Sequence, residues 1–167
     1  MAHRRYPQAA DIPKDQVVII QPDLGHFSGN RDIAQQVEEI ESLTKAIRLH
    51  HLETIVAKVS QIQPGYFLGK GKREEIRDFV EITEPDVIVF NASLSPVQQR
   101  NLEKLWKCKV IDRTGLILEI FGDRAQTREG RLQIELAALD YQKSRLVRSW
   151  THLERQRGGA GFMGGPG

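Results

Sequence analysis

Runs of β-branched and other apolar residues alternate along the chain with segments whose apolar positions recur every three to four residues. The continuous runs predict strands buried on both faces, and the periodic segments predict helices that bury one face. The expected strands cover 17–20, 55–59 within the alternating segment 52–62, 86–91 and 110–111. The expected helices run from a cap at Asp32 to near His50-His51, over 72–83, from Ser95-Pro96 through Leu105, and over 114–124.

Strands that alternate with helices in this order favour crossover connections between parallel strands, with helices on both faces of the sheet. We therefore predict an α/β fold with a small parallel sheet and flanking helices. No internal repeat interrupts this arrangement.

A longer amphipathic segment follows, in which one stripe of positions recurs at alternating spacings of four and three residues. The stripe comprises Leu132, Leu136, Leu139, Lys143, Leu146, Trp150 and Leu153, and only Lys143 is not apolar. This a/d pattern is typical of a helix packed lengthwise on a partner helix. We expect the helix to begin after an N-cap at Thr127 and to run to about Gln156.

The long helix leads into a glycine-rich tract, and no downstream helix remains in the sequence to cover the leucine stripe. The pattern therefore indicates half of an α-helical hairpin, and we expect the chain to be a piece of something larger. Four parts are predicted: a flexible leader (1–16), an α/β subdomain (17–125), a long amphipathic helix that is the first half of the hairpin (126–157), and a truncated glycine-rich hairpin loop (158–167).

Composition narrows the class of protein. The 40% of hydrophobic residues can fill one core, and Cys108 as the only cysteine excludes an intrachain disulfide and a cysteine-rich metal site. No apolar run approaches membrane-spanning length, and the N-terminus lacks the apolar core of a secretion signal. These features predict a chain without a membrane span, located in the cytoplasm.

A glycine and lysine segment at 65–71 is close to a phosphate-binding P-loop but does not match it. Three residues instead of four separate its glycines, and the hydroxyl that would bind magnesium is missing after Lys70. Gly69, Lys70, Gly71 and Lys72 remain weak candidates for holding an anion at a helix start. The alternative, which we favour, is a loop that turns into a helix.

No residues form a pattern that predicts catalysis or metal binding. Asp112 is more simply explained as a helix cap after the strand 110–111. His50 and His51 are adjacent and therefore point apart, and His152 stands alone on the long helix. Ser93, Ser95 and Cys108 lack an assignable base and orienting partner.

Basic residues concentrate at the end of the long helix, next to the glycine tract. Between Tyr141 and Arg157 there are five basic side chains and one acidic side chain, Glu154. The candidate contacts to nucleic acid are Arg145, Arg148, Arg155, Arg157, Gly158 and Gly159. Arginine pairs with phosphates bidentately, and glycine lets a backbone approach RNA closely. An ordinary solvated basic face explains the pattern equally well on composition.

Several long ungapped motifs carry a family resemblance. They are YFLGKGK at 66–72, NASLSPVQQRNL at 91–102, VIDRTGLILEIF at 110–121, RAQTREGRLQIELA at 124–137, WTHLERQ at 150–156 and GGPG at 164–167. In this order they closely resemble the N-terminal region of HflX-type GTPases. The resemblance covers about residues 17–167.

The resemblance implies an N-terminal α/β subdomain, then a helical hairpin, then a Ras-like GTP-binding domain. It implies binding to the large (50S) ribosomal subunit and its RNA, the splitting or rescue of ribosomes, and GTP and Mg²⁺ as cofactors of the full-length protein. The second hairpin helix and the GTPase domain have no counterpart here, so GTP hydrolysis is not expected of this chain. The exposed stripe could also support self-association. The alternative function is an autonomous nucleotide- or phosphate-binding α/β protein centred on Gly69–Lys72.

Overall fold

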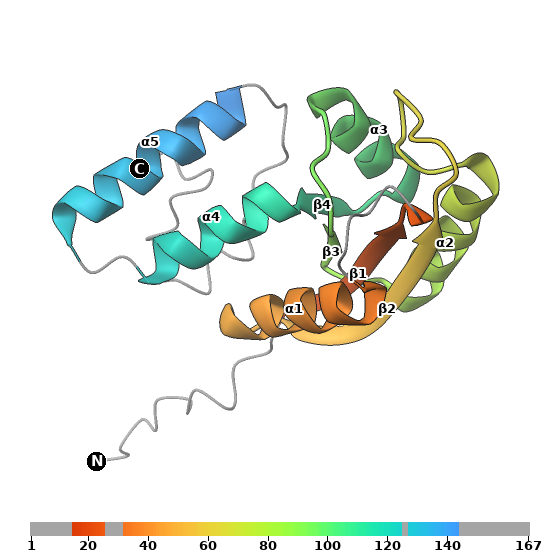
Figure 1. Ribbon diagram of the computed structural model, residues 1–167, viewed down its shortest axis with the longest axis horizontal. Coiled ribbons are helices and arrows are strands. Elements are labelled where there is room, and N and C mark those ends of the chain that lie inside the picture. Colours follow the sequence, from red (N-terminus) through yellow and green to blue (C-terminus); the bar gives the residue numbers. More distant parts are fainter. Residues whose placement is uncertain (1–14, 26–31, 125–126, 144–167) are drawn as a thin grey trace, which may run out of the picture.

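The structure is a computed structural model that describes residues 15–25, 32–124 and 127–143 (Figure 1). The elements of these segments are β1 (Gln16–Asp23), α1 (Ile33–Ala46), β2 (His50–Lys58), α2 (Lys70–Thr83), β3 (Val87–Phe90), α3 (Pro96–Trp106), β4 (Lys109–Asp112), α4 (Arg113–Arg124) and α5 (Arg128–Lys143). Within the described residues, the four strands form one sheet in the order β2-β1-β3-β4, and every pairing is parallel. The predicted α/β class is confirmed.

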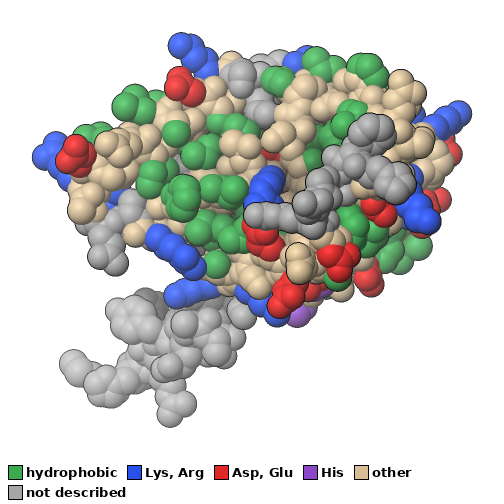
Figure 2. Space-filling view, in the orientation of Figure 1, with side chains coloured by type: hydrophobic (Ala, Val, Ile, Leu, Met, Phe, Trp, Pro, Cys, Tyr) green, Lys and Arg blue, Asp and Glu red, His purple; other side chains and the backbone are tan. Residues whose placement is uncertain are grey.

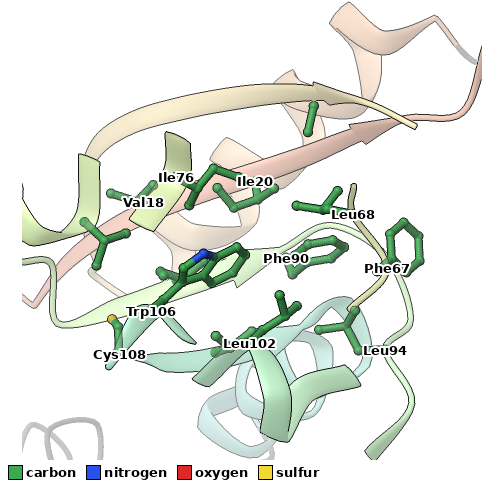
Figure 3. Close-up of a cluster of buried hydrophobic side chains, with 14 of the residues drawn as sticks. Val18, Ile20, Phe67, Leu68, Ile76, Phe90, Leu94, Leu102, Trp106 and Cys108 are labelled. Atoms are coloured by element: carbon green, nitrogen blue, oxygen red, sulfur yellow. The ribbon is translucent and has the colours of Figure 1, made fainter. Parts of the chain in front are cut away.

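Alternating side chains of the strands fill a core on each face of the sheet. Val17 and Ile19 of β1 pack on the face covered by α1 and α4, whereas Val18 and Ile20 pack on the face covered by α2 and α3. Figure 3 shows the second cluster, in which Phe90 and the α3 side chains Leu102 and Trp106 gather over the sheet. A fully buried large apolar side chain contributes about 1.5–3 kcal/mol, so these two cores carry most of the stability.

Helix caps explain where several helices begin. The Asp32 side chain accepts a hydrogen bond from the Ala34 amide at the start of α1. Ser95 and Gln98 form a reciprocal capping box at the start of α3, with Pro96 in its first turn. Thr127 Oγ1 accepts from the Gly130 amide at 3.0 Å, so the predicted cap of the long helix is confirmed.

Gly130 stands where a capping box would place glutamate. A Cβ atom at this position would lie 2.8 Å from the capping oxygen Oγ1 of Thr127, which is closer than Cβ atoms normally approach. The glycine therefore leaves room for the threonine cap.

Several predicted boundaries are wrong; strand β1, for example, ends at Asp23 rather than at Ile20. The first helix ends at Ala46 rather than near His50-His51, because Arg48 adopts a left-handed backbone conformation with φ of 61° and the chain turns into β2 there. The two histidines are the first residues of β2. Strand β2 ends at Lys58, the last residue that pairs with β1.

The glycine and lysine loop is also shorter than predicted. Helix α2 begins at Lys70 instead of Lys72, with Gly69 as its N-cap. The start of α2 is set by the backbone bond from the Arg73 amide to the Gly69 carbonyl, which closes its first turn.

Helix α5 lies beside α4 at one end of the molecule (Figure 1). Its inward side carries the buried Ala138 and Tyr141, with Gly130 and Ile134 half-buried. The predicted leucine stripe faces the other way: Leu132, Leu136 and Leu139 are 51%, 64% and 57% exposed. The part of the predicted helix after Lys143 lies outside the described residues.

Candidate functional site

The carboxyl end of the sheet is the candidate location for a ligand-binding site in this fold. The chain leaves β1 toward β2 on one side, then crosses to β3 and β4 on the other side, so the topology reverses between β1 and β3. Open α/β sheets commonly bind ligands outside the strand ends at such a reversal. The polar residues at the ends of β1, β3 and β4 are therefore the relevant ones.

These residues form a continuous hydrogen-bond network. Asn91, just after β3, donates from Nδ2 to Gln21 Oε1 of β1 at 2.6 Å. Gln21 Nε2 in turn donates to Gln36 Oε1 of α1 at 3.0 Å. Arg113 at the start of α4 donates to Asn91 Oδ1 at 3.1 Å and to Glu39 Oε1 of α1 at 2.6 Å. The network links both strands at the reversal to both helices on one face.

Asp112 lies beside this network at the end of β4 and is fully buried. Its Oδ1 accepts from the Gly115 amide at 3.0 Å, which caps α4 as predicted. Its Oδ2 accepts from the Leu94 amide at 3.0 Å, and the Tyr141 hydroxyl of α5 donates to Oδ1 at 2.7 Å. One carboxylate therefore organises the start of α4, the turn before α3 and the position of α5.

From the sequence, only Asp112 of this cluster was predicted, as a helix cap. The signal was a polar residue immediately after each buried apolar run, namely Gln21, Asn91 and Asp112-Arg113. In the structure these side chains bond mainly to one another. The network has a structural role, because its donors and acceptors bond to one another and connect β1, β3, α1 and α4.

The weak anion candidates lie elsewhere, at the start of α2. Gly69, Lys70 and Gly71 are exposed, and added Cβ atoms at Gly69 and Gly71 would meet no atom within 4 Å. Neither glycine is therefore required by close packing. Lys72 Nζ lies 3.3 Å from Glu75 Oε2, an ion pair within the same helix.

The segment before α2 is held firmly against α3. Phe67 has φ of 68°, a conformation that is unfavourable for a bulky residue. A pair of backbone bonds with Gln63 and an edge-to-face contact with the Phe90 ring at 5.1 Å hold it there. The Asn101 side chain of α3 adds a bond of 2.8 Å to the Gly65 carbonyl. The Arg73 guanidinium stacks on the Tyr66 ring, 3.8 Å from its centroid.

A cavity of about 380 Å³ opens at the other end of the sheet, between the last turns of α2 and α3. Cys108 lines it together with Val80, Leu105 and Trp106. Burial, reinforced by the charges of Asp86 and Glu103, raises the pKa of the Cys108 thiol to about 12. The thiol donates to the Pro85 carbonyl at 3.4 Å and is protonated at neutral pH.

The predicted contacts to nucleic acid lie outside the described residues; they are Arg145, Arg148, Arg155, Arg157, Gly158 and Gly159. Among the residues the structure describes, no three His, Cys, Asp or Glu side chains lie together as a metal site. No helix in the same segments is long and apolar enough to span a membrane.

A family model described as the N-terminal region of GTP-binding GTPases matches residues 34–122, and a second model, described as their middle region, matches 124–167. The chain belongs to the GTP-binding GTPase N-terminal family. The junction between the two matches falls in the last turn of α4, shortly before α5 begins at Arg128.

Similar curated proteins agree with this family. The chain is 49% identical over 139 residues to GTPase HflX of Escherichia coli K12, and 53% identical over 138 residues to GTPase HflX of Magnetococcus marinus. These alignments cover 83% and 82% of the chain but 32% of each relative. The resemblance to the N-terminal region of HflX-type GTPases is confirmed, and the chain spans about a third of the length of the curated relatives it matches.

A solved structure shares the fold. The structure of a GTP-binding protein from the archaeon Sulfolobus solfataricus, in complex with GDP, superposes with a TM-score of 0.57 and 20% sequence identity. The superposition covers 77% of this chain and 37% of that chain.

Proposed function

We propose that the chain is the N-terminal ribosome-binding module of an HflX-type GTPase, which acts in the cytoplasm on the large ribosomal subunit and its RNA to split or rescue ribosomes. GTP hydrolysis with Mg²⁺ is assigned to a GTP-binding domain outside these 167 residues, because the chain contains no P-loop. The observation that carries the proposal is the pair of consecutive family matches over 34–122 and 124–167.

The outer side of α5 supports the assignment to a hairpin. Hydrophobic side chains gather over α4 and α5 on the face shown in Figure 2. Leu132, Leu136 and Leu139 are more than half exposed on α5, and they recur at the spacing of a helix-packing stripe. A second hairpin helix would remove this apolar surface from water, which is favourable by roughly 25 cal/mol per Å².

The RNA contacts are proposed for the basic end of the hairpin. Arg145, Arg148, Arg155 and Arg157 would pair with phosphates, and Gly158-Gly159 would let the backbone approach the RNA. These residues follow the described part of α5 along the chain.

The test compares binding to isolated large subunits across a salt series. Replacing Arg155 and Arg157 with glutamine should weaken binding, and each lost phosphate contact should reduce the slope of log affinity against log salt by roughly 0.7–0.9. The matched control is Lys58→Gln, which removes one exposed positive charge from β2 of the α/β part. Equal losses from both changes, or binding without salt dependence, would count against ribosomal RNA as the partner.

A further inference from the structure

Helix α5 is attached to the rest of the protein by a narrow face. Few residues of α5 turn inward: Ala138 and Tyr141 are buried, and Gly130 and Ile134 are half-buried. The three leucines of the outer stripe are more than half exposed. Apolar burial therefore holds α5 less strongly than it holds α3, which buries Leu102 and Trp106.

A buried hydrogen bond contributes to this attachment. The Tyr141 hydroxyl donates to Oδ1 of Asp112 at 2.7 Å. This bond joins α5 to the end of β4. Tyr141 lies near the carboxyl end of the sixteen-residue helix, so α5 is anchored there. A hydrogen bond to a charged group contributes more than one between neutral groups.

Asp112 does not need α5 to keep its own position. Its Oδ1 also caps α4 through the Gly115 amide, and its Oδ2 accepts from the Leu94 amide. The neighbouring Arg113 donates to Asn91 and to Glu39, and these two bonds connect α4 to the sheet and to α1. The α/β layers therefore keep their main polar contacts when the bond to Tyr141 is broken.

We propose that the Tyr141–Asp112 hydrogen bond is a conformational latch, and that α5 opens as a unit from α/β layers that stay folded. In the closed state only the outer leucine stripe of α5 is available to a partner, and in the open state the inner stripe of Ile134, Ala138 and Tyr141 becomes available as well. The strength of this hydrogen bond thereby sets the fraction of molecules in which both faces of α5 are accessible. This inference goes beyond the proposed function and does not depend on ribosome binding.

The test is hydrogen exchange on the 167-residue chain. Amides of α5 should exchange through an opening that leaves β1 and β3 protected. Tyr141→Phe removes only the hydroxyl and should accelerate exchange in α5 by roughly 10- to 100-fold, the range expected for a hydrogen bond to a charged group. Exchange in β1 and β3 should stay unchanged.

Tyr66→Phe is the matched control, because Tyr66 packs on the opposite face of the sheet and the substitution is the same chemical change. It should leave exchange in α5 unaltered. The latch is overturned if Tyr141→Phe accelerates α5 and the strands to the same extent, since α5 would then open only by global unfolding. It is also overturned if the substitution leaves exchange in α5 unchanged.

A second variant reports on the same opening without amide exchange. Ala138 is fully buried on the inner face, so the thiol of Ala138→Cys should react with an alkylating reagent only when α5 opens. Adding Tyr141→Phe should accelerate labelling at residue 138 by the same factor as exchange in α5, while peptide mapping separates this thiol from Cys108. Labelling at 138 that is insensitive to Tyr141→Phe would contradict the latch.

Discussion

Arg113 and Glu39 join α4 to α1 across the carboxyl end of the sheet, with 2.6 Å between Nη2 and Oε1. The same guanidinium donates to the buried Asn91 at 3.1 Å. Arg113 therefore has two roles, one in a partly solvated ion pair and one in a buried network, and the two can be separated by mutation.

Replacing Arg113 with alanine should lower the free energy of unfolding by about 1–3 kcal/mol, because it leaves the buried Asn91 without this donor. Glu39→Gln should cost less than about 1 kcal/mol, because its side chain is 39% exposed and the ion pair is screened by water. Urea denaturation of both variants measures the difference. Equal costs would show that the ion pair, and not the bond to Asn91, carries the stabilisation.

Truncating a leucine in the core and truncating a leucine on the outer side of α5 should have very different effects on stability. Leu102→Ala opens a cavity in the core beneath α3, where the side chain is fully buried, and should destabilise the protein by about 2–5 kcal/mol. Leu136→Ala removes the same atoms from the outer stripe of α5. The Leu136 side chain is 64% exposed, so this substitution should change stability by less than about 0.5 kcal/mol. Thermal unfolding of the two variants is the measurement. A comparable loss from Leu136→Ala would mean that the stripe is covered within the chain itself.

The outer stripe of α5 should make the chain self-associate when no other helix covers it. Sedimentation velocity of the 167-residue chain should show an average mass that rises with concentration. Replacing Leu132, Leu136 and Leu139 with serine should abolish this rise while leaving the α/β part folded by circular dichroism. A concentration-independent monomer before substitution would argue against the stripe as a self-association surface.

Cys108 should be unreactive in the native protein. Its pKa of about 12 keeps the thiol protonated at pH 8, so alkylation should be limited by unfolding and should accelerate sharply in urea. The same shift has a consequence for stability. A pKa raised above its ordinary value of 9.0 means that the folded state holds this proton more tightly, so its contribution is complete below about pH 9 and is lost as the pH rises toward 12.

Cys108→Ala is the variant that isolates this contribution, because it removes the titrating group. The loss of stability between pH 9 and pH 12 should be shallower in Cys108→Ala than in the unsubstituted chain. Identical alkaline profiles would contradict the assignment, as would rapid alkylation of the folded protein at pH 8.

The α/β part should fold without nucleotide. Buried apolar side chains fill a core on each face of the sheet, and the start of α2 lacks the hydroxyl of a P-loop. Calorimetric titration of the chain with GTP, GDP and ATP should therefore give no micromolar binding that depends on magnesium. Such binding, if lost in Lys70→Ala and Lys72→Ala but kept in Lys58→Ala, would favour the autonomous nucleotide-binding alternative centred on Gly69–Lys72.

The type and order of the elements were predictable because local sequence controls them. The β-branched run 17–20 and the run 86–91 can bury both faces only as inner strands, and Ser95-Pro96 and Thr127 supply caps with little tertiary context. The end of the first helix was predicted less well. The apolar period continues past Ala46, and the left-handed turn at Arg48 is fixed by the need to start β2 beside β1.

The sequence by itself determined the α/β class, the family and the existence of a leucine stripe, because apolar periodicity and long motifs are properties of neighbouring residues. Only the tertiary structure decided which side of α5 is covered, since both Leu136 and Tyr141 are large and only packing chooses between them. It also decided that Gln21, Asn91 and Arg113, which are far apart along the chain, meet in one network. Their meeting depends on strand order, and strand order is a long-range choice that no local pattern encodes.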